Sequence, residues 1–291
     1  MVMHIAVCLS RLPDPNTVEV DPLTGAVDAS RMLYILNPAD AAALERALQL
    51  RAPEDRVTAL TVGPAEADSI LRDALAVGAD DVLRVWEEGR TSTRPAVTAL
   101  LLATALRTTE LPDMLLCGTR SLATGSGKVP ALIAEYLDWP VVTDIVDFTL
   151  QGSMVRFLRR LAKGARSEGE VMLPAVLAVE AGAAALRYAG LPDLMKAKRA
   201  AIPVQDLSEL GLSPVDLNFP APTAQATMPP YRRPREIFVP EASLPPHERV
   251  LQVMSAGIAQ KSGRIVSGSP EQAADQIIAF LADRGFVDRA G

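Results

Sequence analysis

The sequence contains very little cysteine and histidine. Its 291 residues include only two cysteines, Cys8 and Cys117, and two histidines, His4 and His247. Each cysteine ends an apolar run, which predicts buried thiols and argues against a disulfide framework, and a reducing compartment fits this pattern. The histidines lie far apart in the chain, so a His-based catalytic triad and a His-rich metal site are excluded. We therefore predict no catalytic residue and no metal site.

Long apolar runs and an excess of positive charge are also missing. No apolar stretch reaches the roughly 18 to 20 residues that a membrane-spanning helix needs, and no signal core precedes the first predicted strand. The net charge of −6 argues against nucleic acid and anionic membranes as partners, because the overall field repels them. We therefore expect a cytoplasmic protein without membrane insertion, whose partners are small molecules or other proteins.

The apolar content of 49% is ample for a packed core, and it is distributed as strands alternating with helices. Such alternation implies parallel pairing, since each crossover places a helix on a face of the sheet. The predicted fold class is therefore α/β, with a doubly wound, mostly parallel sheet. The predicted strands span residues 4–9, 57–62, 81–85 and 113–117, and the predicted helices span residues 38–51, 70–75, 95–108 and 130–137.

After Pro140 the apolar pattern changes to a period of two residues. Residues 142–150, 154–161 and 171–179 are predicted as extended segments, and residues 164–170 as a polar break between them. These segments should add antiparallel strands at one side of the sheet.

Prolines recur between residues 213 and 246, where they exclude a regular helix and favour an extended arm. A last helix is predicted from a cap at Ser269 to a stop before Gly285, with an apolar stripe that must pack on something. We therefore divide the chain into an α/β domain at residues 1–205 and, at residues 206–291, an extended proline-rich arm with a C-terminal helix.

The loop after Cys117 has the composition of a phosphate cradle. Small residues let the backbone approach a ligand, the start of the next helix offers free N–H groups, and hydroxyl and cationic side chains add donors. The glycine spacing is not that of a Walker motif, and a plain flexible connection is the alternative. Loops after Leu9, Leu36 and Val62 should converge on the same edge of the sheet. The cradle comprises Gly118, Thr119, Arg120, Ser121, Leu122, Ala123, Thr124, Gly125, Ser126, Gly127, Lys128 and Val129.

The segment YAGLPDLMKAKR, at residues 188–199, places an apolar Leu-Pro tip directly before a short basic helix. Pro192 suits the first helical turn, and the cations at the far end complement the helix dipole. An ordinary surface helix with solvated lysines is the alternative. The segment resembles the recognition loop of the electron transfer flavoprotein beta subunit, which carries LP-(N/S/D)-(I/L)-MKAK-(K/R).

The resemblance extends over residues 1–205 at recognisable spacing. It implies the beta subunit of a heterodimeric electron transfer flavoprotein, which is an electron carrier and not an enzyme, built on a Rossmann-like sheet that binds an adenine nucleotide. Its further pieces, in the family's order, are RLPD at 11–14, NP at 37–38, TVGP at 61–64, ALAVGAD at 74–80, LLCG at 115–118, LDWP at 137–140 and LPAV at 173–176.

The resemblance also implies the cofactors. FAD is shared with an alpha subunit that supplies most of its site, and the cradle holds AMP or, in electron-bifurcating members, part of a second FAD. Ala123 and Gly125 stand where the family has acidic residues, so the contacts to the nucleotide should differ. Asn37 is expected to cap its helix or to meet the ribose. The other walls implied for the nucleotide are Cys8, Leu9, Pro38, Ala39, Asp40 and Val62.

Three protein partners follow from the resemblance: the alpha subunit, a flavin-dependent dehydrogenase as electron donor, and a quinone oxidoreductase or another acceptor. Leu191, with Pro192, Met195 and Lys196, would dock the donor, and such an aliphatic anchor is worth about 2 kcal/mol. A leucine folded back on the protein's own edge is the alternative. Only Arg187-Tyr188 remains of the family's NEPRYP-like run, so the donor need not be an acyl-CoA dehydrogenase.

Two other functions stay open at this point. A bifurcating beta subunit would bind FAD in place of AMP and use NADH. A stand-alone nucleotide-dependent enzyme, hydrolysing ATP or adenylating a substrate, would need carboxylates for Mg²⁺ near the phosphates, and residues 118–129 contain none.

Overall fold

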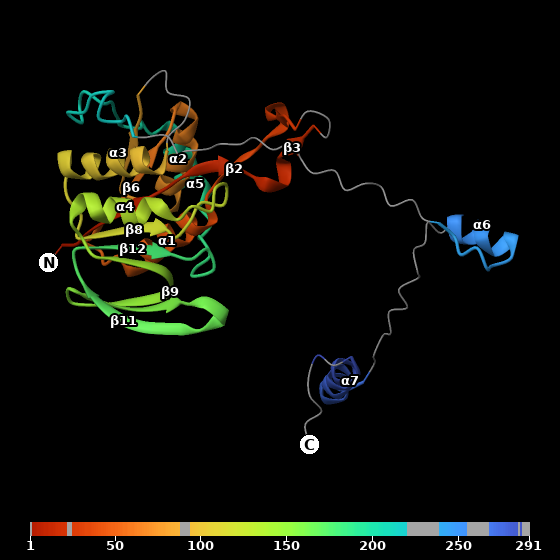
Figure 1. The fold of residues 1–291 in the computed structure, drawn as a ribbon. Helices are drawn as coiled ribbons and strands as arrows, with labels where there is room; N and C mark the ends of the chain where they lie inside the picture. The colour runs from red at the N-terminus through yellow and green to blue at the C-terminus, as the bar shows by residue number, and fades with distance from the viewer. Residues whose placement is uncertain are drawn as a thin grey trace. The chain divides into compact units, whose positions relative to one another are not determined.

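The computed structural model describes residues 2–21, 25–87, 94–219, 239–254, 268–284 and 286. The chain forms two compact units, Met1–Pro230 and Tyr231–Gly291 (Figure 1). The first unit contains the central sheet, the apolar core and the candidate site.

A nine-stranded sheet forms the centre of the first unit, in the order β11-β10-β9-β12-β8-β1-β6-β7-β13. All neighbouring pairs from β9 to β13 in this order are parallel, whereas β9, β10 and β11 pair antiparallel. Every residue of β8 and β12 is buried, as is typical of parallel strands covered on both faces. The strands are β1 (His4–Cys8), β6 (Arg56–Val62), β7 (Asp81–Val85), β8 (Met114–Gly118), β9 (Val141–Gln151), β10 (Met154–Arg160), β11 (Arg166–Met172), β12 (Ala175–Val179) and β13 (Val204–Gln205).

Helices cover both faces of this sheet. Helices α1 and α2 pack in one apolar cluster and helices α3 and α4 in a second, and Figure 1 shows α3 and α4 on the same side of the sheet. The predicted doubly wound, mostly parallel α/β fold is therefore confirmed. These helices span α1 (Pro38–Leu50), α2 (Asp68–Val77), α3 (Pro95–Thr108) and α4 (Lys128–Leu137).

The antiparallel strands lie at one end of the sheet, as predicted, but one of their boundaries was wrong. Residues 166–170 belong to β11 and do not form a polar break, and the extended segment predicted at 171–179 divides between β11 and the central strand β12. Strand β11 is the outermost strand and alternates between exposed and half-buried positions. Its polar residues therefore face solvent. Because the strand contains no apolar run, the apolar pattern of the sequence did not predict it.

Several short elements were not predicted, because two or three residues show no period. They form two small ribbons after β1 and single turns at loop corners. The ribbons pair β2 (Arg11–Pro13) with β5 (Tyr34–Leu36) and β3 (Glu19–Val20) with β4 (Val27–Asp28), and the turns are the 3-10 helices η1 (Pro15–Thr17), η2 (Ala29–Arg31), η3 (Ala65–Ala67) and η4 (Ala162–Gly164).

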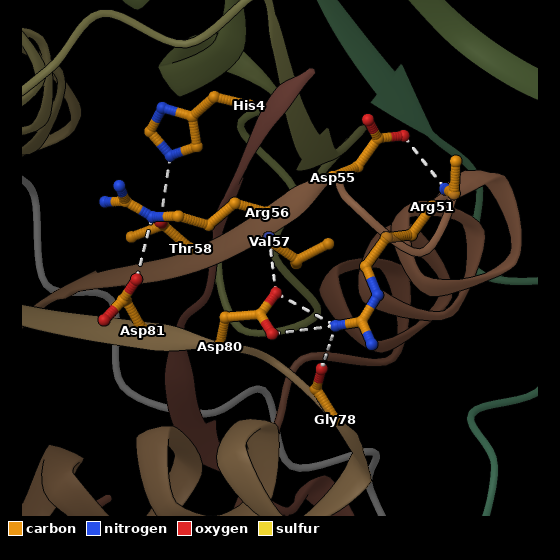
Figure 2. Close-up of polar contacts among 10 residues, drawn as sticks. His4, Arg51, Asp55, Arg56, Val57, Thr58, Gly78, Asp80 and Asp81 are labelled. Carbon is orange, nitrogen blue, oxygen red and sulfur yellow. Dashed lines mark hydrogen bonds and ion pairs between the residues drawn. The ribbon is translucent and has the colours of Figure 1, made fainter. Parts of the chain in front are cut away.

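Polar side chains join the strands at the amino-terminal edge of the sheet (Figure 2). The guanidinium of Arg51 donates to both carboxylate oxygens of Asp80 at 2.9 and 3.0 Å, and Asp80 also accepts from the backbone N–H of Val57 at 2.8 Å. Nε2 of His4 lies 2.8 Å from Oγ1 of Thr58, and burial lowers the pKa of this histidine. These contacts tie the beginnings of β1, β6 and β7 together. His4 is the first residue of β1 and Cys8 the last, so His4 lies at the end of the strand away from the cavity.

The second unit contains two described helices, α6 (Pro246–Met254) and α7 (Pro270–Asp283). Helix α7 begins with the predicted cap, since Ser269 and Gln272 form a reciprocal capping box. Its apolar side chains Ile277 and Ile278 are exposed within the described residues. Helix α6 was not predicted, and most of the predicted proline-rich arm, at 220–238, lies outside the described residues.

Candidate functional site

A cavity of about 370 Å³ opens at the carboxyl ends of β1, β6 and β8. The strand order changes direction at this place, because β6 lies on one side of β1 and β8 on the other. Ligands of doubly wound sheets bind at such a switch point. The four loops expected to converge do so: Leu9, Asn37, Val62 and Gly118 all line the cavity.

Most of the predicted wall residues contribute to the lining. Pro38, Ala39, Thr119, Leu122, Ala123 and Gly125 belong to the same segments but do not line the cavity. A role in nucleotide binding stays a prediction for the whole set. The lining members of the predicted set are Cys8, Leu9, Asn37, Asp40, Val62, Gly118, Arg120, Ser121, Thr124, Ser126, Gly127, Lys128 and Val129.

Asp40 joins three walls of the cavity. Its Oδ2 accepts from the backbone N–H of Ser10 at 2.8 Å and from the Ser10 hydroxyl at 2.5 Å, and its Oδ1 accepts from the backbone N–H of Gly118 at 2.9 Å. A Cβ on Gly118 would lie 2.2 Å from Oδ1 of Asp40 and 2.8 Å from its backbone nitrogen. Only glycine therefore allows the end of β8 to approach helix α1 this closely.

The carboxyl of Asp40 is buried, and burial raises its pKa from 3.8 to about 6, although its hydrogen bonds act in the opposite direction. Both oxygens of this buried carboxylate already accept hydrogen bonds from the protein. Asp40 is thus better described as a support beneath the cavity than as a group free to meet a ligand.

Asn37 uses its side chain differently from a helix cap, while contact with a ribose stays a prediction. It occupies the cap position of α1, but its side chain makes no capping hydrogen bond. Instead its Nδ2 donates to the carbonyl of Arg120 at 3.1 Å, and its Oδ1 accepts from the backbone N–H of Leu122 at 3.2 Å. Asn37 is buried, so it fixes the first turn of the cradle loop from below. The predicted cap position of Asn37 before Pro38 is confirmed, but the side chain does not make the hydrogen bond expected of a cap.

The cradle ends at the start of helix α4, two residues earlier than predicted. The helix begins at Lys128, and Gly127 before it adopts the left-handed conformation with φ of 58°. A side chain on Gly127 would be strained there whatever the space around it. No side chain caps this helix start, so the backbone N–H groups of Lys128 and Val129, two residues of the cavity lining, have no capping partner among the described side chains.

The cavity has a cationic rim. Arg11, Arg120 and Lys128 all line it, whereas the carboxylate in its lining is the occupied Asp40. Arg11 lies 3.8 Å over the ring of Tyr34, and Arg120 forms an ion pair with Asp144 at 2.9 Å while its side chain stays 53% exposed. This arrangement favours an anionic ligand.

The thiols of Cys8 and Cys117 lie at adjacent strand ends in the cavity lining, and both are free and buried. A hydrogen bond that the Cys117 thiol donates to Cys8, together with burial, raises the pKa of Cys117 well above its usual value. Thiolates are the reactive form of cysteine, so a raised pKa disfavours reaction of this thiol at neutral pH. The prediction of buried thiols is confirmed.

Some of the lining was not predicted from the sequence. Trp86 directly follows β7. Pro95, Thr98 and Leu102 lie on one face of the first two turns of α3. Trp86 could have been found, because it follows an apolar strand at the same sheet edge as Val62. The α3 residues carry no such signal, since their position depends on how the helix packs.

The segment predicted to dock a partner forms helix α5 (Leu191–Arg199). All four predicted residues, Leu191, Pro192, Met195 and Lys196, are exposed, and Leu191 keeps 72% of its surface. Leu191 is therefore not folded back on its own edge. Lys196, Lys198 and Arg199 occupy the last turn of the helix, where the dipole favours cations. Docking itself stays a prediction.

Among the described residues, no group of three or more His, Cys, Asp or Glu side chains is placed to hold a metal ion. Within the same part of the chain, every helix is too short or too polar to cross a membrane.

Comparison with known proteins agrees with this geometry. Residues 24–210 match the electron transfer flavoprotein domain. The chain belongs to the electron transfer flavoprotein beta subunit family. It is 31% identical over 214 residues to the caffeyl-CoA reductase-Etf complex subunit CarD of Acetobacterium woodii, covering 73% of this chain and 81% of that protein. It is 31% identical over 220 residues to the electron transfer flavoprotein subunit beta of Methylophilus methylotrophus (74% and 80%), and 30% identical over 222 residues to protein FixA of Azotobacter vinelandii (74% and 79%).

Membership of this family confirms the resemblance seen in the sequence. The chain is an electron transfer flavoprotein beta subunit in its role, and association with flavin follows from the family. The similar proteins include both a subunit named for a reductase complex and beta subunits named only for electron transfer.

Proposed function

We propose that this beta subunit pairs with an alpha subunit, shares one FAD with it, and carries electrons from a flavin-dependent dehydrogenase to a quinone oxidoreductase or another acceptor. FAD, when bound, supplies the redox chemistry. The residues of this chain would scaffold the flavin, hold a second nucleotide and dock the donor. The two unpaired, buried thiols support a reducing, cytoplasmic setting, and the chain would act as a carrier subunit and not as an enzyme.

For the cavity we propose AMP as the ligand. The single observation that carries this is the cavity at the switch point of the sheet, whose lining includes the cations Arg11, Arg120 and Lys128. Arg120 and Lys128 would face the phosphate together with the first N–H groups of α4. The adenine would lie towards the apolar wall near Val62 and Leu102.

Exposed apolar and basic residues of helix α5 support the docking proposal. Leu191 and Met195 offer aliphatic surface, while Lys196 and its neighbours favour an acidic rim on the partner. An anchor already held in a helix loses little conformational freedom on binding. We propose that the donor dehydrogenase binds here.

One alternative remains supported by a specific observation. The caffeyl-CoA reductase-Etf subunit is among the similar proteins, so a second FAD in place of AMP is the competing ligand, with NADH as its reductant. An ATP-hydrolysing or adenylating enzyme has weaker support, because the cradle has no carboxylate and Asp40 is already occupied by protein donors.

Equilibrium dialysis of the purified heterodimer, stripped of nucleotide, against AMP, ADP and FAD tests the cavity. Lys128→Ala is expected to weaken binding of AMP about tenfold, since a charge-assisted hydrogen bond is worth about 1.5 kcal/mol or more. Lys163→Ala is the matched control, because Lys163 is also an exposed lysine and lies in the turn between β10 and β11. Retention of none of the three ligands by the wild type would refute the proposal, and preference for FAD over AMP would favour bifurcation.

A further inference from the structure

The docking helix is preceded by a segment without regular secondary structure, residues 184–190. Consecutive side chains of this segment take different directions. Leu186 packs against the apolar cluster that contains α1 and α2, Arg187 reaches helix α1, and Tyr188 is fully exposed. The exposed docking residues therefore begin immediately after a two-residue attachment to the body of the protein.

The polar half of that attachment is the contact between Arg187 and Glu45. The carboxylate of Glu45, on α1, accepts from the backbone N–H of Arg187 at 3.1 Å, from its Nε at 2.9 Å and from its terminal nitrogen at 2.9 Å. Gln49 adds a fourth donor at 3.0 Å. A planar guanidinium that meets both carboxylate oxygens fixes direction as well as distance, which a lysine cannot do.

Glu45 is buried, with only 6% of its side chain exposed, whereas 44% of the Arg187 side chain is exposed. Burial alone would raise the pKa of Glu45, but the hydrogen bonds from Arg187 and Gln49, together with the Arg187 charge, leave the pKa below its usual value. A buried carboxylate so fully bonded holds its partner in one geometry. Three of the four donors to this carboxylate belong to Arg187, so the contact serves mainly to hold the segment.

We propose that Glu45 is a positioning residue: through Arg187 it holds the segment so that Tyr188, Leu191 and Met195 form one docking surface for the electron donor. The inference rests on the proposed docking function of helix α5. It adds Tyr188 to that surface and assigns its orientation to a residue 142 positions earlier in the chain. Glu45 itself does not touch the partner.

The same helix also reaches the cavity. Asn37 and Asp40 lie at the start of α1, and Glu45 follows Asp40 by five residues, about 7.5 Å along the helix axis. One rigid element thus carries both the support of the cradle and the support of the docking segment.

The test is steady-state reduction of the holo heterodimer by a flavin dehydrogenase first shown to reduce the wild type. If loss of the clamp lowers the docking-competent fraction of the segment to about a tenth, the KM for the heterodimer rises about tenfold while kcat is unchanged. Glu45→Gln keeps the shape of the side chain and removes its charge. Arg187→Lys keeps the cation but removes the planar guanidinium that meets both carboxylate oxygens. This second variant tests the same contact if Glu45→Gln does not fold. Both should raise KM at unchanged FAD content.

Two companion variants make the result decisive. Arg51→Gln removes another ion pair next to α1, that with Asp80, and should leave KM and kcat as in the wild type. Leu191→Ala reports on docking itself. A raised KM for Leu191→Ala with a wild-type KM for Glu45→Gln and Arg187→Lys would overturn the clamp and keep the docking proposal. A wild-type KM for all of these variants would overturn both.

Discussion

The buried carboxyl of Asp40 makes the stability of this protein depend on pH in a direction opposite to that of a salt-bridged aspartate. Its pKa rises from 3.8 to about 6 on folding, mainly through burial. The folded state therefore binds this proton more tightly than the unfolded state, and stability falls as pH rises from about 4 through 6. The change corresponds to about 3 kcal/mol in total, because each tenfold difference in proton affinity is worth about 1.4 kcal/mol.

Asp40→Asn removes this titration and keeps the size of the side chain. The amide loses one acceptor towards Ser10, which adds a constant cost at every pH. The informative quantity is therefore the difference in unfolding free energy between the variant and the wild type, followed across pH. We expect the wild type to lose about 1 kcal/mol relative to Asp40→Asn between pH 5 and pH 7.

Thermal unfolding of the two heterodimers at a series of pH values measures this difference. A shift of about 2 to 4 °C in the relative midpoints is expected over that range. A constant difference between pH 5 and pH 7 would refute the reasoning, since it would mean that Asp40 titrates alike in the folded and unfolded states.

Two further predictions concern the cavity walls. Gly118→Ala should destabilise the protein by about 1 to 3 kcal/mol and abolish tight nucleotide binding, because the new Cβ collides with the backbone of Asp40; Gly182→Ala, in open space, is the control, and calorimetry of both variants checks the expectation. Asn37→Ala should leave helix α1 intact but loosen the cradle, which predicts about tenfold weaker AMP binding with unchanged helix content by circular dichroism. Unchanged AMP affinity in either cavity variant would contradict the corresponding contact.

Much of the fold could be predicted because central strands are apolar throughout. The runs ending at Cys8, Val62, Val85 and Cys117 identify β1, β6, β7 and β8, and their loops had to meet at one edge of a parallel sheet. Strand β11 could not be found in this way, since an edge strand needs no apolar run. Helix α6 was not predicted, because the prolines before it favoured an extended arm as far as its first residue.

The site could be predicted in outline, but not in its internal contacts. Backbone loops follow from strand ends, whereas the partners of Asn37 lie 83 and 85 residues away in the chain, at Arg120 and Leu122. Propensity favoured a helix cap for Asn37, and the tertiary contact prevailed. The bond between Glu45 and Arg187 likewise carries no local signal.

The most direct test of the central claim is the cofactor content of the complex. Co-expression of this chain with its candidate alpha subunit, followed by extraction and quantification of bound nucleotides, gives FAD and AMP per heterodimer. We predict a stable heterodimer with one FAD and one AMP. Two FAD without AMP would point to a bifurcating flavoprotein, and a chain that forms no stable complex and carries neither nucleotide would contradict the account.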